Sequence, residues 1–532
     1  MPKPLTQNRR IILVDWLIGI CQSNKIKHET LHLGIFIMNK YLRKIKYQIP
    51  NSNIQAVGIV AVNVAAKISE IKCIELAKIC TLCDNIYTIQ ELKNIERDII
   101  ETLDYKLSYD SIWASVKVFC QNEKMEKNKY FLTYYLSNVI LLNPFYGLIN
   151  HQQLVNSIIE FTHLLYNDGP INIPNNICMI YIYKCYKLEI MSKLTVEIKQ
   201  LFSDLGIYEF IIEKFNDLNC SSKSFKNFLS ISSNVIMCDL NIFSPNDIHN
   251  RKIIKQLGEG TYGKVELVDI NDKQVALKII LDFEYEKIGI GPMLLCEINN
   301  LRKLNHTNIN QLQGLYYDYH GKNLYLALEL MDKTLLHHVT IDGVSEESKI
   351  SYILQLLSGL EYLHSQNIMH RDLSPSNILL SGNRLVISDF GMSRYFPDEK
   401  LIADFSKSIY SPLYRPIEVY LKKIPYNQKS DVWACGCIIG FILIGQHIFQ
   451  GRTETDILLN MSQALTNSLV HIGFMEIKKR YPQYYDIILK MLAIRPDERI
   501  TVSKALTLFN DIFIIQQKTN NLCDQKIEIM NI

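Results

Sequence analysis

The sequence has no long hydrophobic run and no excess of charge of one sign. Its longest apolar run, Ala434 to Gly445, is too short to span a bilayer, and Met1 to Arg10 lacks the apolar core of a signal peptide. The formal net charge is only +3, so no overall field favours nucleic acid or an anionic membrane. We therefore expect an intracellular protein, cytoplasmic or nuclear or both, with no nucleic-acid or membrane partner.

The sequence also lacks a cysteine framework, because its thirteen cysteines are scattered along the chain. This usage is typical of a reducing compartment, where cysteine behaves as a small buried hydrophobe. Cys80 and Cys83 form a C-x-x-C pair, which suggests zinc or redox chemistry. No second pair and no histidine lies nearby at ligand spacing, so we expect these two side chains to pack in a core.

What the chain does have is a helical pattern at its start. With 532 residues, 48% of them hydrophobic and 21% charged, it has room for two to four globular domains. From Arg9 to about Lys106, apolar residues recur at steps of three and four, with breaks near Ser23, Pro50 and Cys83. Residues 56–66 are apolar on nearly all sides, which predicts a central buried helix in an all-α bundle.

Short motifs in this region resemble the cyclin box over roughly residues 8–108. In order, they are Arg10–Leu17 (RIILVDWL), Glu29–Leu31 (ETL), Ala65–Lys67 (AAK), and Tyr87–Thr88 with Glu96. The resemblance implies that Lys67 and Glu96 bond to a kinase partner, near the helix that carries Glu297. The alternative for these two residues is an ordinary solvated face.

Two further segments follow this region. Helical periodicity continues in Phe131–Leu142 and Leu154–Leu165, and we expect the second cyclin repeat at residues 110–215. Residues 216–249 are rich in serine, asparagine and aspartate, which predicts a linker. A linker of this length allows the first half of the chain to bind the second half, at an effective concentration of about a millimolar.

A glycine-rich turn between two predicted strands opens the second half. Gly258, Gly260 and Gly263 lie in this turn, and a third predicted strand ends at Lys278. The strand-turn-strand context differs from the strand-turn-helix of dinucleotide-binding folds. The glycines allow backbone amides to close over the phosphates of ATP, and Lys278 can reach the α- and β-phosphates.

The run from His370 to Gly391 has the residues that phosphoryl transfer requires. This chemistry needs one carboxylate beside the incoming hydroxyl and two oxygen ligands for magnesium on the nucleotide phosphates. Asp372 fits the first role, and Asn377 and Asp389 fit the second. A His-Arg-Asp triplet alone is usually a surface turn. Asn377 at the right offset and the Asp-Phe-Gly that begins at Asp389 disfavour that interpretation.

These motifs, together with Gly291–Ile298 (GPMLLCEI) and His447–Leu458, resemble a cyclin-dependent kinase over residues 250–510. The resemblance implies a set of site residues. The catalytic residues would be Asp372, Lys278, Glu297 paired with Lys278, and Ser411 bridging to Asp372. The nucleotide-binding residues would be Leu257, Gly258, Gly260, Gly263, Val265, Ala276, Lys278, Glu329, Met331 and Leu379. The ligands of Mg²⁺ would be Asn377 and Asp389. Glu418 is expected to pair with Arg499.

Two residues depart from the pattern of that family. Ser374 replaces a lysine that steadies the γ-phosphate, and one such contact is worth about 10²- to 10³-fold in rate. Cys296 replaces one of three arginines that hold an activating phosphate, the other two being Arg371 and Arg394. We expect slow catalysis rather than none, and weak dependence on phosphorylation near Ser406.

We predict a multidomain chain in which an all-α cyclin fold of two helical repeats precedes an α+β bilobal protein kinase fold. The predicted parts are 1–109 (cyclin box), 110–215 (second repeat), 216–249 (linker), 250–331 (small lobe), 332–515 (large lobe) and 516–532 (tail).

The predicted function is Ser/Thr phosphorylation of proteins with Mg-ATP, activated by the fused cyclin, in cell-cycle or transcription control. The enrichment in Ile, Asn, Lys and Tyr suggests an AT-rich genome, such as that of a parasite or large virus, and host cell-cycle proteins as partners. One alternative is a weakly active or inactive pseudokinase scaffold that engages cell-cycle regulators. Another is a cyclin half that binds a host kinase.

Overall fold

The computed structural model describes the chain in two compact units. Unit 1 consists of Met1–Asp239 with Glu284–Leu295, and unit 2 of Leu240–Phe283 with Cys296–Ile532. The described residues are 7–45, 50, 53–70, 72–107, 112–126, 129–130, 133–134, 136–137, 141, 151–166, 241–242, 247–248, 250–260, 263–270, 273–282, 285–318, 321–395, 410–421, 427–466 and 471–530.

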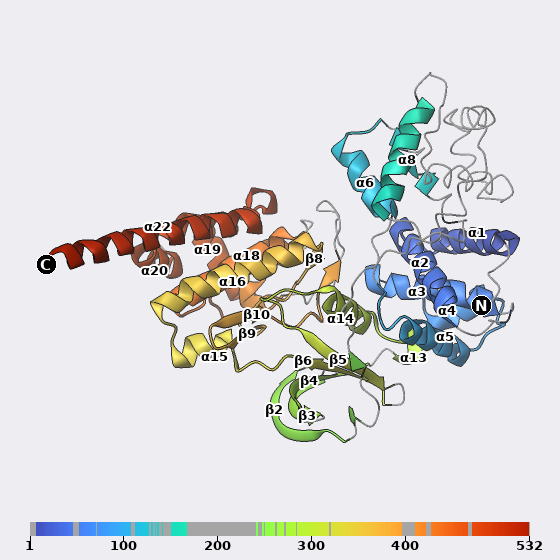
Figure 1. The fold of residues 1–532 in the computed structure, drawn as a ribbon, viewed down its shortest axis with the longest axis horizontal. Coiled ribbons are helices and arrows are strands. Elements are labelled where there is room, and N and C mark those ends of the chain that lie inside the picture. The colour runs from blue at the N-terminus through green and yellow to red at the C-terminus, as the bar shows by residue number, and fades with distance from the viewer. Residues whose placement is uncertain are drawn as a thin grey trace. The chain divides into compact units, whose positions relative to one another are not determined.

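Unit 1 begins with a helical bundle (Figure 1). Its helices are α1 (Gln7–Ser23), α2 (His28–Lys44), α3 (Ile54–Ser69), α4 (Leu76–Leu82) and α5 (Ile89–Thr102). Every residue of α3 from Ala56 to Ile68 is buried, and α3 packs against α1, α2 and α5. At Gly34 of α2, a Cβ would lie 2.6 Å from the Cα of Val62, so glycine permits the close approach of α2 to α3. The prediction of a central buried helix is confirmed.

The C-x-x-C pair of this bundle is part of its core. Cys80 and Cys83 are free thiols with exposed fractions of 9% and 0%. Burial raises the pKa of the Cys83 thiol to about 11, so the thiol is protonated at neutral pH. Among the described residues there is no group of three His, Cys, Asp or Glu side chains that could hold a metal ion. The core-packing prediction is confirmed.

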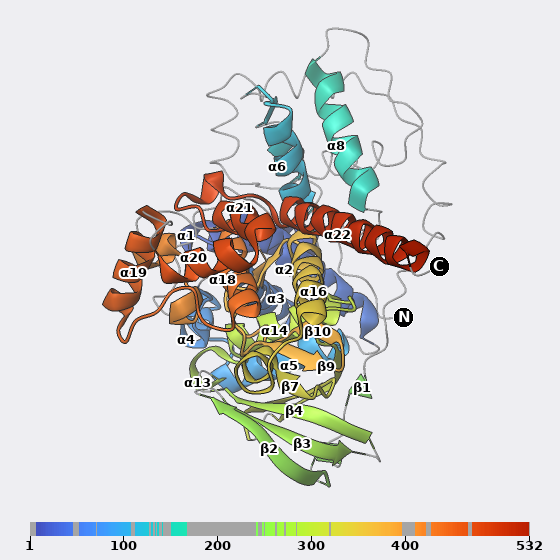
Figure 2. The ribbon, with the colours of Figure 1, turned by 90° about the vertical axis from the view of Figure 1, so that its left-hand side faces the viewer.

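Two helices, α6 (Ile112–Asn122) and α8 (His151–Tyr166), come from the segment predicted as the second cyclin repeat. They pack side by side, as Figures 1 and 2 show. The remainder of that repeat, and the predicted linker up to residue 240, fall largely outside the described residues.

Unit 2 begins with a six-stranded sheet in the order β1-β5-β6-β4-β3-β2. The strands are β1 (Asn241–Ile242), β2 (Lys252–Gly260), β3 (Gly263–Ile270), β4 (Lys273–Leu281), β5 (Leu312–Asp318) and β6 (Asn323–Leu328). All neighbours are antiparallel except β1, which pairs parallel with β5. Figure 2 shows β2, β3 and β4 side by side at one end of this sheet.

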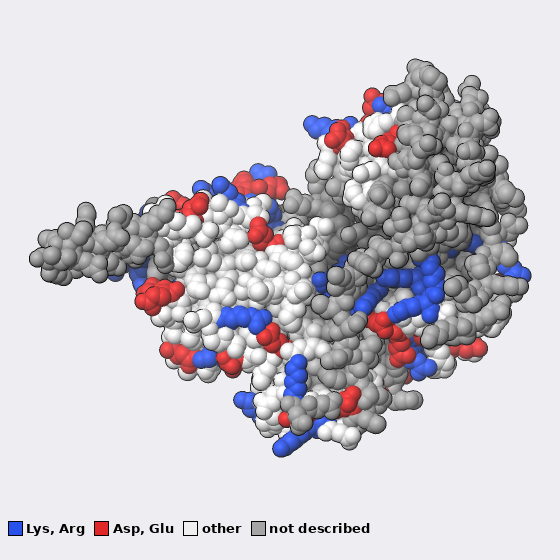
Figure 3. All heavy atoms as spheres, in the orientation of Figure 1, with Lys and Arg blue, Asp and Glu red and all other residues white. Residues whose placement is uncertain are grey.

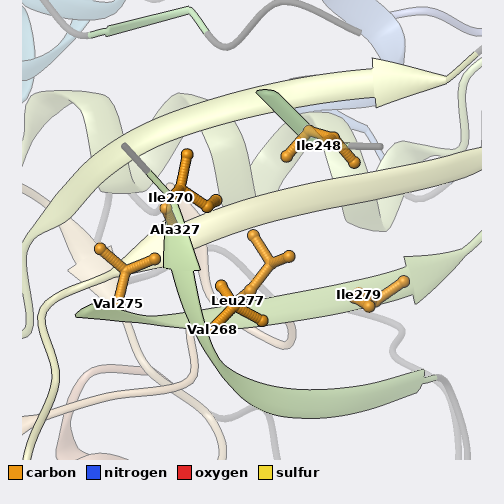
Figure 4. Close-up of a cluster of buried hydrophobic side chains, with 7 residues drawn as sticks. All are labelled: Ile248, Val268, Ile270, Val275, Leu277, Ile279 and Ala327. Carbon is orange, nitrogen blue, oxygen red and sulfur yellow. The ribbon is translucent and has the colours of Figure 1, made fainter. Parts of the chain in front are cut away.

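The sheet extends further toward the N-terminus than the sequence predicted. Ile248 is 1% exposed and joins a hydrophobic cluster on the sheet, shown in Figure 4. Its partners there are Val268, Ile270, Val275, Leu277, Ile279 and Ala327. Residues 240–249, which we assigned to the linker, therefore belong to unit 2. A two-residue strand and one buried isoleucine give no periodic signal in the sequence.

The segment after β4 leaves unit 2. Residues 284–295, which we assigned to the small lobe, cluster with unit 1, and α13 (Tyr285–Ile288) packs against α4. Helix α14 (Pro292–Lys303) begins in unit 1 and continues into unit 2, where it carries Glu297.

The rest of unit 2 is mainly helical. Its helices are α15 (Leu335–His337), α16 (Glu346–Ser365), α17 (Ile417–Leu421), α18 (Lys429–Ile444), α19 (Glu454–Thr466), α20 (Ile472–Arg480), α21 (Pro482–Met491) and α22 (Val502–Met530). Its short strands are β7 (Lys333–Thr334), β8 (Ile368–Met369), β9 (Ile378–Ser381), β10 (Arg384–Ile387) and β11 (Arg394–Tyr395). Helix α18 is buried from Ser430 to Leu443 and packs against α16, α20 and α21.

The predicted pair of Glu418 and Arg499 is confirmed. Two hydrogen bonds of 2.7 and 2.6 Å join the guanidinium to the carboxylate, and both side chains have an exposed fraction of 0%. The pair ties α17 to the residues just before α22.

The charge distribution on the surface and the length and hydropathy of the helices are as the sequence predicted. On the face shown in Figure 3, acidic and basic side chains of the described residues are interspersed. No helix in the described part of the chain is both long and apolar enough to cross a bilayer.

Candidate active site

Unit 2 contains a cavity of about 270 Å³ between the sheet and the large lobe. Eight of the predicted nucleotide-binding residues line it, namely Leu257, Gly258, Val265, Ala276, Lys278, Glu329, Met331 and Leu379. Both predicted metal ligands, Asn377 and Asp389, also line it. The structure thus brings together residues from β2, β3, β4 and β9 and from three loops.

Gly260 and Gly263 are not among the lining residues. They face each other as the last pair of the β2–β3 ladder, and a Cβ at Gly263 would lie 1.9 Å from the carbonyl oxygen of Ile279. Gly263 is therefore required for the close approach of β3 to β4. Thr261 and Tyr262, at the tip of the turn, lie outside the described residues.

Several lining residues were missed by the sequence analysis. They are Asn310, Leu330, Asp332, Lys333, Thr334, Ser376 and Ser388. Asn310 is 2% exposed and donates from Nδ2 to the Ser388 hydroxyl at 3.3 Å. It follows the histidine-containing turn before β5 without any motif of its own, so only its position in the fold reveals it.

An ion-pair cluster lies at one side of the cavity. Lys278 Nζ donates to Glu297 Oε1 at 2.8 Å and to Asp389 Oδ1 at 2.7 Å. Burial alone would lower the pKa of Lys278, but the charges of Glu297 and Asp389 outweigh it and raise that pKa. The same lysine charge lowers the pKa of Asp389. The lysine is therefore a fixed positive charge, and its predicted pairing with Glu297 is confirmed.

Asp372 lies within reach of two of its predicted neighbours. Ser411 donates from both its hydroxyl (3.1 Å) and its backbone N–H (3.2 Å) to Oδ1 of Asp372. Asn377 donates from Nδ2 to Oδ2 at 2.9 Å and to the Asp372 carbonyl oxygen at 2.8 Å. Burial raises the pKa of the Asp372 carboxyl, although these donors favour the charged form.

A buried aspartate of α18 holds this catalytic loop. Asp431, 0% exposed, accepts the backbone N–H groups of His370 at 2.8 Å and Arg371 at 3.0 Å, and the Tyr410 hydroxyl at 2.9 Å. Arg371 has a φ of +65°, a conformation that costs free energy for a non-glycine residue. Asp431 thus stabilises a strained turn beside Asp372, and this role was not predicted from the sequence.

Both predicted metal ligands keep an oxygen atom for a cation. Asn377 uses its side-chain Nδ2 as a donor, which leaves its side-chain carbonyl oxygen, Oδ1, for a cation. Asp389 uses Oδ1 for Lys278 and is 45% exposed, so its second oxygen is accessible. Carboxylate and amide oxygens suit a hard divalent cation that takes its other ligands from phosphates and water. The two residues fit such an ion.

The two departures from the kinase pattern are both buried. Ser374 is 4% exposed. Its backbone carbonyl oxygen accepts the Asn377 N–H at 3.0 Å. Cys296 on α14 is 2% exposed, and burial raises the pKa of its thiol. The region of Ser406 lies outside the described residues.

Within unit 1, Lys67 and Glu96 lie against the segment that precedes α14. They form an ion pair with side-chain exposures of 0% and 3%. Glu96 Oε2 also accepts the backbone N–H of Ile290 at 3.2 Å. The alternative of a solvated face is therefore wrong for these two residues, because both side chains are buried and Glu96 binds the Ile290 N–H of segment 285–290.

Comparison with known proteins gives two family models and several relatives. The protein kinase domain model matches residues 251–508, and the cyclin N-terminal domain model matches residues 2–108. "Putative serine/threonine-protein kinase L670" of Acanthamoeba polyphaga mimivirus is 30% identical over 96% of the chain and 94% of that protein.

Other relatives match over nearly the whole chain or over about half of it. "Putative serine/threonine-protein kinase L268" of the same virus is 31% identical over 95% of the chain and 97% of its own length. "Cyclin-dependent kinase C-3" of Oryza sativa subsp. japonica is 32% identical over 48% of the chain and 88% of that kinase. The full-length similarity includes both the cyclin and the kinase parts.

Proposed function

Because the chain belongs to the serine/threonine-protein kinases, with a cyclin N-terminal domain ahead of a kinase domain of the cyclin-dependent type, we propose that its cyclin half activates its own kinase half. The observation that carries this proposal is the position of Glu297. Glu297 binds Lys278 at 2.8 Å and lies on helix α14. The first residues of this helix cluster with the cyclin unit. Kinases of this type require that ion pair for activity.

Each site residue has a role in the proposed reaction. Asp372 accepts the proton of a protein Ser or Thr hydroxyl, and Ser411 fixes the carboxylate in position. Lys278 holds the α- and β-phosphates of ATP, while Leu257, Val265, Ala276 and Leu379 enclose the purine.

Asn377 and Asp389 complete the site by binding the metal ion. We propose that the divalent cation is Mg²⁺, which neutralises charge on the phosphates during transfer. The backbone of Glu329 and Met331 would bond adenine. The Glu329 side chain itself is bound to Arg384, at 2.6 and 3.0 Å, which keeps it away from this role.

The biological setting that we propose is control of a host cell cycle or of transcription. Two relatives that match over nearly the full chain are putative serine/threonine-protein kinases of a virus. An intracellular place of action, in cytoplasm or nucleus, is supported by the buried free thiols of the described residues.

Transfer itself is tested with radiolabelled ATP and a panel of Ser and Thr peptides. The full chain is expected to label peptide, and Asp372→Asn to reduce labelling to background, because the amide cannot accept the proton. Asp497→Asn, an exposed aspartate far along the large lobe, serves as the matched control. Equal labelling by the full chain and Asp372→Asn would instead favour the inactive scaffold.

Activation in cis is tested by Lys67→Met combined with Glu96→Leu. Replacing a buried ion pair by apolar residues of similar size generally preserves stability, so the fold should persist. The bond to the Ile290 N–H is lost, however, and we expect the rate to fall at least about tenfold. An unchanged rate in a correctly folded double variant would refute activation through this contact.

A further inference from the structure

Lys93 contacts the same segment as Glu96, but it does so through an ion pair and a ring contact that have no role in the proposed activation. It lies three residues before Glu96 on α5, so both side chains project from one face of that helix. Lys93 Nζ donates to Glu286 Oε2 at 2.7 Å and lies 4.7 Å from the ring centroid of Tyr285. Both partners belong to α13, in the same compact unit as α5.

The burial of Lys93 makes this contact selective. Its side chain is only 4% exposed, and a lysine is almost never buried to that extent without a partner. Tyr285 is 9% exposed and covers the ammonium with its ring, whereas Glu286 is 66% exposed and supplies the charge. A segment with a neutral or basic residue in place of Glu286 would leave a desolvated ammonium without a counter-charge.

We propose that Lys93, Tyr285 and Glu286 form a recognition clamp, by which the cyclin half selects a kinase segment that bears an aromatic residue followed by a carboxylate. The chain's own α13 carries this chemistry, with Tyr285 followed by Glu286. The proposal rests on the proposed function, since the clamp decides which kinase the cyclin half activates. The clamp disfavours wrong partners as well as favouring the right one. A foreign segment without the carboxylate would leave the buried Lys93 ammonium without a counter-charge, which weakens its binding.

Gly289 adds a second requirement on the partner segment. Its φ is +76°, and a Cβ there would lie 1.8 Å from Oε2 of Glu96. Any other residue at this position would be strained and would also displace the acceptor of the Ile290 N–H. The selected segment is thus defined by an aromatic residue, a carboxylate and, three residues after that carboxylate, a glycine.

The test is a charge-reversal cycle in the full chain, with hydrogen exchange of the Ile290 amide as the readout. Lys93→Glu and Glu286→Lys should each speed exchange about tenfold, less than for a fully buried pair because solvent screens Glu286. The double variant restores opposite charges and should return exchange to within about threefold of the original. Singles without effect, or a double variant as fast as the faster single, would overturn the clamp.

Matched controls separate the clamp from general damage. Lys72→Glu reverses an exposed lysine of the same unit and should leave exchange at Ile290 unchanged. Gly289→Ala should speed that exchange, whereas Gly343→Ala, at a φ of +79° with nothing within 4 Å, should not. Equal effects of the two glycine variants would contradict the requirement at Gly289.

Phosphate transfer, measured on the same proteins, distinguishes the two proposals. If hydrogen exchange at Ile290 speeds up in the single charge reversals and recovers in the double variant, while phosphate transfer stays constant in all of them, the clamp is upheld and activation in cis is refuted. Transfer that falls in Lys67→Met with Glu96→Leu, while exchange ignores the charge reversals, would uphold activation and refute the clamp.

Discussion

Two opposing effects act on the Asp372 carboxyl: burial favours its neutral form, and the hydrogen bonds from Ser411 and Asn377 favour its charged form. Because proton acceptance requires the carboxylate and burial raises its pKa, the rate should fall as pH drops through a value above that of an ordinary aspartate. Ser411→Ala removes one bond to the charged form and should move this acid limb upward by about one pH unit. The measurement is kcat against pH, with Ser365→Ala, an exposed hydroxyl, as control. An unmoved limb would contradict this account.

Ser374 is a second single residue that determines the kcat we expect. It occupies the position where related kinases carry a lysine, so no cationic side chain from this position reaches the transferred phosphate. We expect Ser374→Lys to raise kcat by about 10²-fold, as for other single electrostatic contacts to a transition state. Ser365→Lys adds the same charge at an exposed position outside the cavity and should change kcat far less. A slower enzyme after Ser374→Lys would show that the serine is required.

At the scale of elements, the Glu418–Arg499 pair fastens α17 to the chain before α22. Glu418→Gln keeps the shape of the side chain but leaves the buried guanidinium without a counter-charge, so we expect a loss of about 3–5 kcal/mol in the free energy of unfolding. Urea titration of the full chain measures this loss. The exposed pair of Arg495 and Glu498 is the control, and Glu498→Gln should be close to neutral. Similar losses in both variants would argue against burial as the cause.

At the scale of the whole molecule, the proposed activation in cis is intramolecular, because both halves belong to one chain. The specific activity of the intact chain should therefore not change on dilution. A protease site inserted at Ser221–Ser224 cuts the chain in the predicted linker, and the effective concentration of about a millimolar is then lost. We expect the cut protein to lose activity on dilution into the nanomolar range. Activity that stays independent of concentration after cutting would show that the kinase half needs no cyclin half.

Local patterns in the sequence predicted much of the fold and of the cavity. Helical periodicity predicted the helical region that contains α1 to α5, although it placed no break between α3 and α4, and the alternation around Gly258 identified β2 and β3. The spacing of Asp372 and Asn377 predicted their proximity, because five residues in one loop keep their side chains within a hydrogen bond. Such features depend on neighbours in the chain, so a single sequence contains the signal.

Contacts between distant parts of the chain were not predictable in this way. Lys93 and Glu286 are 193 residues apart, and His370 and Asp431 are 61 apart. Neither pair repeats a period or completes a motif, and each exists only because separate elements pack together. The same is true of β1, whose two residues gain their strand conformation by pairing with β5.

The sequence by itself determined the order of the two family domains and the chemical groups of the site, since the reaction requires those groups at fixed spacings. The tertiary structure decided which residues close the cavity, that Asn241 and Ile242 join the sheet, and that residues 284–295 cluster with the cyclin unit. Burial and pairing are properties of packed surfaces. Only the packed chain could show that Lys93 is buried and that its counter-charge comes from the kinase half.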